Sequence, residues 1–393
     1  MTNRISPFSD TTTQALSSLF GQHMSRRTAL VGLMGLVLAG CGSPTGGDTT
    51  RTSPSPTAPP VQSTPPPTPT PDEATPETVD NPGRTYVIFK GHHGNVNAVA
   101  WSPDSKYIAS GGNDNLVQVW DATSGTPLMV YKGHPAAVLS LTWSPDGATI
   151  ASGGGAYGDN KDYSVRVWTA LTGKDSFTYD EHKGVVTIVR WSYDGQHIAS
   201  ASSAETSVHV WEAQTGKTTT TYSGNDDSVS SLAWSPDSKS IVSGVATLMS
   251  GVMHPTVKIW KSLSGDEILT YPGQGANALA WSPDGKLIAS TNNDKIQIWD
   301  AASGKDQTTL QSGNSAVLTL AWSPDGKYLV SGGGSTQSVG SDNIAQVWNV
   351  STKQAITTYR SHQLPVSSVS WSPDGTRVAS GSWDGVVRVW QAI

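Results

Sequence analysis

The sequence predicts an all-β fold built from seven similar repeats, and three observations support this prediction. Fourteen of the 15 tryptophans fall into two series of seven, and successive members of the first series stand 41 to 49 residues apart. Each repeat holds short runs in which apolar and polar residues alternate, as in half-buried strands. The chain also contains 40 Gly and 24 Pro, which favour turns over long helices. A period in the forties with four short strands per repeat is typical of a propeller blade.

The first repeat shows the expected order of elements. Residues 96–101 are expected to form the first strand, which leads through a Ser-Pro-Asp turn to a second strand at 107–110. A third strand is expected at 117–120 and a fourth at 128–131, after which the next repeat begins. The later repeats follow the same order.

The last repeat lacks a fourth strand of its own. It ends at Ile393, after its third strand, whereas residues 84–92 match the fourth-strand segment 127–134. We therefore expect residues 84–92 to complete the seventh blade and to join the two ends of a domain spanning 84–393. Such closure would hide strand edges that otherwise invite aggregation.

These repeats resemble the WD-repeat family. The resemblance covers the chain after residue 83 and rests on Gly-His ahead of a first strand and Trp-Asp at the end of a third: Gly91-His92, Gly133-His134, Trp120-Asp121 and Trp299-Asp300. It implies a seven-bladed β-propeller whose blades each bury a hydrogen-bonded tetrad of His, Ser or Thr, Asp and Trp. Three repeats supply a full set: His92, Ser110, Asp114 and Trp120; His134, Ser152, Asp162 and Trp168; and His362, Ser380, Asp384 and Trp390.

The tetrads imitate a Ser-His-Asp catalytic triad. A nucleophile would be needed once, in a cleft, whereas these residues recur at the repeat spacing, and each serine is expected to bond the indole N–H of its own blade. We therefore expect a structural role and no catalytic residue. The middle blades should be less rigid, because four repeats depart from the set: Glu205 stands beside His182, Asn225 and His254 occupy the fourth repeat, Gln274 the fifth and Asn314 the sixth.

The first 40 residues have the pattern of an export signal. Arg26 and Arg27 precede an apolar run, 28–39, which is shorter than the about 20 residues that cross a membrane but fits a signal peptide. The arginine pair resembles the twin-arginine signal, and the Leu-Ala-Gly-Cys ending at Cys41 resembles the lipobox of bacterial lipoproteins. This implies cleavage of residues 1–40 and acylation of Cys41. The alternatives are an uncleaved anchor and a chance cysteine after small residues.

Residues 41–83 have the composition of a flexible linker. They hold 12 of the 24 prolines and ten threonines, so they cannot bury an apolar core and lack many backbone donors. We expect a lipidated, extended and solvated spacer between the membrane and the repeats. Cys41 is the single cysteine, which excludes an intrachain disulfide.

Three repeats carry insertions between the second and third strands. The second-strand Ser and the third-strand Trp are 10 residues apart in the first and seventh repeats, but 16 or 17 apart in the second, fourth and sixth. In the WD-repeat family these connections share the upper face. The resemblance therefore implies that residues 153–164, 244–256 and 332–344 rise around the central channel, where loops on a rigid scaffold are suited to binding.

We expect these loops to bind a protein or peptide partner, because aromatic and Met side chains suit such contacts. The fifteenth tryptophan, Trp383, lies in the equivalent turn of the seventh repeat, and packing against its own blade is the alternative for it. Neutral insertions are the alternative for the loops. The candidate partner-binding residues are Trp383, Tyr157, Asp159, Lys161, Tyr163, Met249, Met253 and Ser341.

Charge and residue types argue against several functions. The chain has 25 basic and 31 acidic residues, a net charge of −6, which argues against a nucleic-acid partner. Residues 159–162 offer oxygens for calcium but lack the spaced acidic residues and bidentate Glu of an EF-hand. The nine histidines supply no ligand set apart from the tetrads, so we expect no metal and no cofactor.

The resulting interpretation is a monomeric, non-catalytic scaffold, lipid-anchored on the extracytoplasmic side of a bacterial membrane, that binds a protein or peptide through its upper-face loops. Two alternatives stay open. One is an enzyme or cofactor carrier built on the propeller. The other is a receptor for a carbohydrate or other small ligand, with Tyr157, Tyr163 and Trp383 as stacking surfaces. Acidic or histidine side chains converging outside the tetrads would favour the enzyme.

Overall fold

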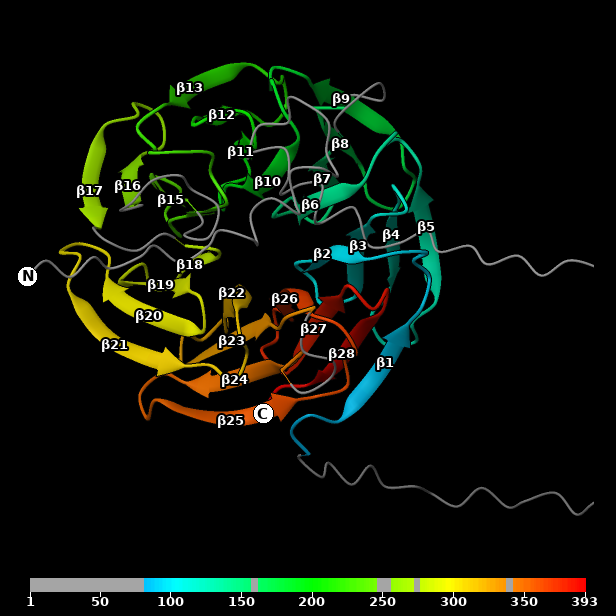
Figure 1. Ribbon diagram of the computed structural model, residues 1–393. Helices are drawn as coiled ribbons and strands as arrows, with labels where there is room; N and C mark the ends of the chain where they lie inside the picture. The colour runs from blue at the N-terminus through cyan, green and yellow to red at the C-terminus, as the bar shows by residue number, and fades with distance from the viewer. Residues whose placement is uncertain (1–80, 157–161, 246–255, 272–275, 337–341) are drawn as a thin grey trace, which may run out of the picture.

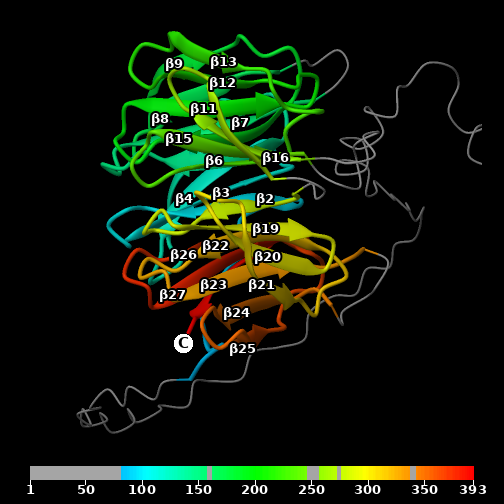
Figure 2. The same cartoon turned by 90° about the vertical axis from the view of Figure 1, so that its left-hand side faces the viewer.

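The computed structural model describes residues 81–393 apart from 157–161, 246–255, 272–275 and 337–341. Its regular elements are β-strands, arranged in seven four-stranded antiparallel sheets that follow one another around a ring (Figure 1). Figure 2 shows the ring from the side, with the strands running between its two faces. Within the described residues no helix is present that could cross a membrane. The predicted all-β, seven-bladed propeller is confirmed.

Each blade except the last is made of four consecutive strands. Blade 1 holds β2 (Val96–Trp101), β3 (Tyr107–Gly112), β4 (Val117–Asp121) and β5 (Pro127–Tyr131). Blade 2 holds β6 (Val138–Trp143), β7 (Thr149–Gly154), β8 (Val165–Thr169) and β9 (Asp175–Tyr179). Blade 3 holds β10 (Val186–Trp191), β11 (His197–Ser202), β12 (Val208–Glu212) and β13 (Thr218–Tyr222). Blade 4 holds β14 (Ser231–Trp234), β15 (Ser240–Gly244), β16 (Val257–Lys261) and β17 (Glu267–Tyr271).

The remaining blades follow the same order until the chain ends. Blade 5 holds β18 (Leu279–Trp281), β19 (Leu287–Asn292), β20 (Lys295–Asp300) and β21 (Asp306–Gln311). Blade 6 holds β22 (Val317–Trp322), β23 (Tyr328–Gly333), β24 (Ala345–Asn349) and β25 (Gln354–Tyr359). Blade 7 holds β26 (Val366–Trp371), β27 (Arg377–Ser382), β28 (Val387–Gln391) and β1 (Thr85–Phe89). The first strand of each blade lies nearest the ring centre and the fourth at the rim (Figure 1).

The N-terminal strand closes the ring as expected from the sequence. β1 pairs antiparallel with β28, with Val87 opposite Val389 and Phe89 opposite Val387. The pairing is extended at its end, where the Gln391 N–H donates to the Arg84 carbonyl at 2.9 Å. The seventh blade therefore combines the two ends of the described chain, and opening the ring would require breaking this ladder.

Small residues in the second strands let neighbouring blades approach closely. A Cβ added to Gly111 would lie 2.7 Å from Val138 Cγ1, on the first strand of blade 2. Such an approach is closer than real Cβ atoms show, so a larger residue at position 111 would require Val138 to shift. The same contact between a second-strand glycine and the first-strand valine of the next blade recurs at Gly153 with Val186, Gly332 with Val366 and Gly381 with Val96.

Aromatic stacks join the blades near the rim. In six of the seven junctions an aromatic residue on the fourth strand stacks on the third-strand tryptophan of the next blade, with ring centroids 4.3 to 4.8 Å apart. Blades 5 and 6 are the exception, because Leu310 takes the aromatic position beside Trp348. The six pairs are Phe89–Trp120, Tyr131–Trp168, Tyr179–Trp211, Tyr222–Trp260, Tyr271–Trp299 and Tyr359–Trp390.

Candidate functional site

Two faces of the ring carry different connections. The connections between the second and third strands lie on one face, which we call the upper face, and they include the three long insertions. The turns between the first and second strands lie on the opposite face, which we call the lower face. The insertions in blades 2, 4 and 6 thus share one face, as their position in the repeat implied.

The insertions of blades 2 and 6 leave the ring from closed, well-packed ends. The Gly155 N–H donates to the Ala137 carbonyl at 2.9 Å, and the Gly334 N–H donates to the Ala316 carbonyl at 3.0 Å. Gly155 has φ +141° and a Cβ there would collide with the Asp162 carbonyl, so glycine is needed where the two ends of the loop meet. The scaffold therefore fixes where these loops begin and end.

The structure describes two of the candidate partner-binding residues. Tyr163 is half-buried at the end of the blade 2 insertion. Trp383 is half-buried in the β27–β28 turn, where its backbone N–H donates to the Pro365 carbonyl at 3.1 Å. Tyr157, Asp159, Lys161, Met249, Met253 and Ser341 lie outside the described residues, as do Arg26, Arg27, Cys41, His254 and Gln274.

The structure brings the tetrad residues together within each blade. In blade 7, His362 Nδ1 lies 3.1 Å from Asp384 Oδ2, His362 Nε2 lies 2.8 Å from Ser380 Oγ, and the Trp390 indole donates to Ser380 at 3.1 Å. In blade 1, His92 contacts Asp114 at 3.0 Å and Ser110 at 2.8 Å. In blade 2, Ser152 accepts from Trp168 at 3.0 Å and lies 2.8 Å from His134 Nε2.

Two members depart from the expected pattern. Trp120 is fully buried under the stacked Phe89 ring, but its indole N–H has no hydrogen-bond partner. The predicted hydrogen bond from Trp120 to Ser110 is therefore wrong. His134 Nδ1 lies 3.5 Å from Asp162 Oδ2, beyond a good hydrogen bond, because Asp162 Oδ1 instead accepts from the Ser164 hydroxyl and N–H.

The buried tetrads are unsuited to nucleophilic catalysis. Ser110, Ser152, Ser200 and Ser380 have no exposed surface, so no substrate reaches their hydroxyls. The carboxylate beside His Nδ1 can only accept, so the proton of a neutral imidazole lies on Nδ1, and Nε2 accepts from the serine hydroxyl, whose oxygen accepts from the tryptophan. The serine thus serves as a hydrogen-bond relay.

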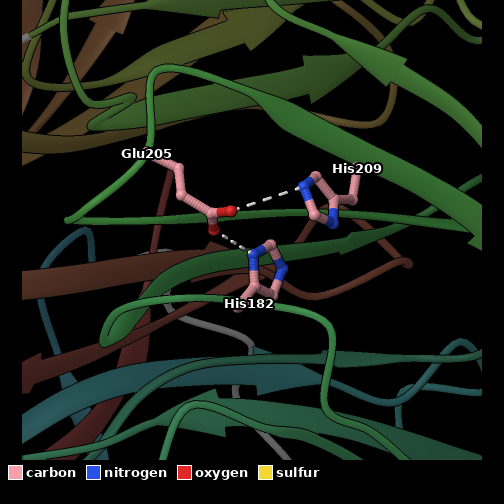
Figure 3. A group of neighbouring side chains, drawn as sticks. All are labelled: His182, Glu205 and His209. Atoms are coloured by element: carbon pink, nitrogen blue, oxygen red, sulfur yellow. Dashed lines mark hydrogen bonds and ion pairs between the residues drawn. The ribbon is translucent and has the colours of Figure 1, made fainter.

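Blade 3 holds a second histidine that the sequence interpretation did not place. Figure 3 shows Glu205 between His182 and His209. Glu205 Oε2 lies 2.9 Å from His182 Nδ1, and Glu205 Oε1 lies 3.8 Å from His209 Nε2. The two imidazole rings stack with centroids 4.5 Å apart. His209 comes from β12, two residues before Trp211, a position that is polar in all seven repeats.

We tested whether this cluster could hold a metal ion. Its ligand atoms lie within 4.8 Å of one another, the right scale for His and Glu ligands. However, the Glu205 carboxylate 2.9 Å from His182 Nδ1 can only accept, so the proton of the neutral imidazole lies on Nδ1. His182 Nε2 then accepts from Ser200 at 2.7 Å, and Ser200 accepts from the Trp211 indole at 3.1 Å. A metal at Nδ1 would displace that proton and leave the serine proton without an acceptor. The cluster therefore fits a hydrogen-bond network better than a metal centre.

The electrostatics of the cluster agree with this network. Burial alone would raise the pKa of Glu205, but hydrogen bonds from His182 and Ser202 outweigh it and hold the pKa at about 2. Burial lowers the pKa of His209 to about 4, and the neighbouring imidazole of His182 adds to this decrease. Glu205 is thus ionised and His209 neutral at physiological pH, an arrangement that stabilises blade 3.

The comparisons with known proteins agree with the repeat pattern. A family model described as "WD domain, G-beta repeat" matches residues 83–121, 125–169 and 353–391. These segments cover the first three strands of blades 1, 2 and 7, the three repeats whose sequences carry all four tetrad residues. A second model, described as "Eukaryotic translation initiation factor eIF2A", matches residues 182–352, in the blades whose tetrads depart from the set. The chain therefore contains WD40 repeats at these three segments, and it folds as a seven-bladed β-propeller.

The similar curated proteins match single repeats. WD repeat-containing protein slp1 of Schizosaccharomyces pombe is 53% identical over 38 residues, 10% of this chain and 8% of slp1. Periodic tryptophan protein 2 of Arabidopsis thaliana is 49% identical over 43 residues, 11% of this chain and 5% of the relative. WD repeat-containing protein 1 of Gallus gallus is 54% identical over 33 residues, 8% of this chain and 5% of the relative. The chain thus spans less than a tenth of the length of these relatives.

Proposed function

We propose that this protein is a membrane-anchored, extracytoplasmic scaffold that binds a protein or peptide partner through its upper-face loops and performs no catalysis. The observation that carries the proposal is the set of three insertions, in blades 2, 4 and 6, that leave the same face of a rigid ring. WD40 propellers are typically protein-interaction scaffolds, and a closed ring presents such loops at fixed positions. Trp383, half-buried in the equivalent turn of blade 7, adds an aromatic contact on the same face.

The loops are tested by shortening them. In one variant the insertions 153–164, 244–256 and 332–344 are cut to the ten-residue Ser-to-Trp spacing of blades 1 and 7. Affinity capture from membranes should recover a partner with the intact protein and lose it with this variant. Equal recovery of every partner would contradict the placement of the site. Far-ultraviolet circular dichroism of the variant checks that the propeller has folded.

The anchor rests on the sequence pattern around Cys41. Metabolic labelling with an alkyne fatty acid should label the wild-type protein and leave Cys41→Ser unlabelled, since Cys41 is the single cysteine. The Cys41→Ser protein should also no longer be recovered with the membrane fraction. Intact-mass analysis that finds residues 1–40 still attached, or label retained by Cys41→Ser, would contradict the lipoprotein assignment.

A further inference from the structure

A cavity of about 490 Å³ lies between blades 2 and 3 on the lower face. It is bounded by the first-to-second-strand turns of both blades and by residues of β8 and β9. Its lining residues include the aromatic Trp191 and Phe177 and the acidic Asp146 and Asp194. The volume falls in the range of roughly 300–1,000 Å³ that is typical of small-ligand sites. This cavity is separate from the upper-face loops.

The two carboxylates differ from four of their five counterparts in other blades. Each uses Oδ1 inside its own turn, where Asp146 accepts from the Ala148 N–H at 3.0 Å and Asp194 from the Gln196 N–H at 3.0 Å. Among the described residues neither carboxylate has an ion pair within 4.0 Å. Four equivalent turns do have one: Asp104 with Lys106 at 3.3 Å, Asp284 with Lys286 at 3.5 Å, Asp325 with Lys327 at 3.4 Å and Asp374 with Arg377 at 3.6 Å.

The sequence explains this difference. In three of the paired turns a lysine stands two residues after the aspartate, and Lys239 stands at the same place after Asp237. Blades 2 and 3 have Ala148 and Gln196 there instead. The nearest cation along the chain, Arg190, directs its Nη1 to the Val189 carbonyl at 2.9 Å and to Ser140 Oγ at 3.2 Å. Two aspartates thus line one cavity without an ion-pair partner among the described residues.

The position of Trp191 places an aromatic ring in the cavity wall. In four blades the tryptophan that ends the first strand donates its indole N–H to the preceding blade, as Trp234 does to the Arg190 carbonyl at 3.1 Å. Trp191 instead donates to the Gly195 carbonyl in its own turn at 3.2 Å and is half-buried. The ring therefore stays beside the cavity and does not tie blade 3 to blade 2.

We propose that this cavity binds the side chain of an arginine in an extended segment of a partner protein. A guanidinium is planar, always charged and weakly hydrated, so it can stack on an aromatic ring and donate to a carboxylate at once. Trp191 and Phe177 supply the rings, and the free oxygens of Asp146 and Asp194 supply the acceptors. Charge complementarity selects the cation, because the cavity lining contains no basic residue. This contact lies on the face opposite to the proposed loop site and does not depend on it.

The test uses the full chain in detergent with ¹⁵N-labelled tryptophan indoles, and the Trp191 signal is assigned with Trp191→Phe. The probes are a blocked nonapeptide of glycine and serine with one central arginine and its citrulline counterpart, which has a similar shape but no charge. The arginine peptide should shift the Trp191 signal saturably, with at least tenfold tighter binding than the citrulline peptide. Binding of both peptides within twofold would overturn the proposal.

A second pair of variants separates charge from folding. The double variant Ala148→Lys, Gln196→Lys installs the lysine that equivalent turns already carry, so it should fold and fill the cavity with its own cations. We expect it to bind the arginine peptide at least tenfold more weakly, whereas the matched control Asp284→Asn in blade 5 should bind within twofold of wild type. Unchanged binding by the lysine variant would overturn the proposal. Free arginine amide binding as tightly as the peptide would assign the cavity to a small organic cation and overturn the partner segment.

Discussion

At the scale of single residues, the buried serine of the second strand organises each blade. In six of the seven blades the third-strand tryptophan donates its indole N–H to this serine at 2.9 to 3.1 Å. Where a histidine is present, the serine hydroxyl donates a hydrogen bond to the imidazole, whose other nitrogen faces a carboxylate. These hydrogen bonds stabilise the fold only when all of them are made, since each buried donor or acceptor left without a partner costs about 1–3 kcal/mol.

Comparing two serines tests this account of the relay. Ser380→Ala strands both the Trp390 donor and the His362 acceptor, whereas Ser110→Ala strands only His92 because the Trp120 indole is already unpartnered. We expect both substitutions to lower the free energy of unfolding, and we expect the decrease for Ser380→Ala to be larger by about 1 kcal/mol or more. Urea unfolding followed by tryptophan fluorescence measures the difference. Equal losses would show that Trp120 does use Ser110.

His209 should make stability depend on pH. Its pKa is about 4 in the fold and about 6.5 in a free chain, so between these values the unfolded state binds the additional proton. The contribution is complete above pH 6.5 and is lost as the pH falls toward 4, by up to roughly 3 kcal/mol. His209→Gln, which copies Gln118, Gln297 and Gln346 at the same repeat position, should flatten this part of the curve. Parallel stability curves for the two proteins between pH 4 and 7 would contradict it.

The tetrads could be predicted from the sequence because their members stand at repeated positions within each blade. The cluster around Glu205 could not be predicted, because the third-strand position of His209 holds a different side chain in other repeats: Gln118, Arg166, Lys258 and Arg388. The sequence did contain one sign of the cluster, because this third-strand position is polar in all seven repeats. Whether it meets the histidine depends on side-chain length and on the carboxylate, and Arg388 in blade 7 also reaches Asp384, at 3.0 Å.

At the scale of elements, the fourth strand ties each blade to the next. Tyr271 on β17 is buried, stacks on Trp299 of blade 5 and donates its hydroxyl to Asp306 at the start of β21. Tyr359 makes the corresponding contact to Thr85 on β1 at 2.8 Å. Stacks of this kind contribute about 0.5–1.5 kcal/mol beyond the burial of the rings. They make the ring cooperative.

One substitution on β17 tests the contribution of these stacks. Tyr271→Leu keeps an apolar side chain but removes the stack and the hydroxyl, and we expect it to lower the free energy of unfolding by about 1–3 kcal/mol. Ile268→Ala on the same strand is the control, because Ile268 is 50% exposed and its loss should cost no more than about 0.5 kcal/mol. Denaturant unfolding measures both. A control as damaging as Tyr271→Leu would contradict the role of the stack.

The strands of the first repeat could be predicted to within two residues, because alternation and turn residues mark them clearly. The contacts between blades were harder to predict. A stack joins residues from two repeats whose separation varies with loop length, as in Tyr271–Trp299 and Tyr222–Trp260. The cavity beside Trp191 was likewise not predicted, because the direction of an indole N–H depends on the neighbouring blade.

At the scale of the whole molecule, both proposed binding sites depend on closure of the ring. Upper-face loops and the lower-face cavity keep fixed positions only if the seven sheets form one closed body. β1 provides that closure, since it supplies the fourth strand of blade 7 and its Phe89 stacks on Trp120 of blade 1. The strand therefore contacts both sides of the junction between the last and the first blade.

Amide hydrogen exchange of β1 in the full chain tests ring closure most directly. The amides of Val87 and Phe89 lie in the ladder with β28, and we expect them to exchange as slowly as those of the neighbouring strand β27, through global unfolding. Exchange of the β1 amides at the rate of an unprotected peptide, while β27 stays protected, would mean an open seventh blade and would contradict the closed ring.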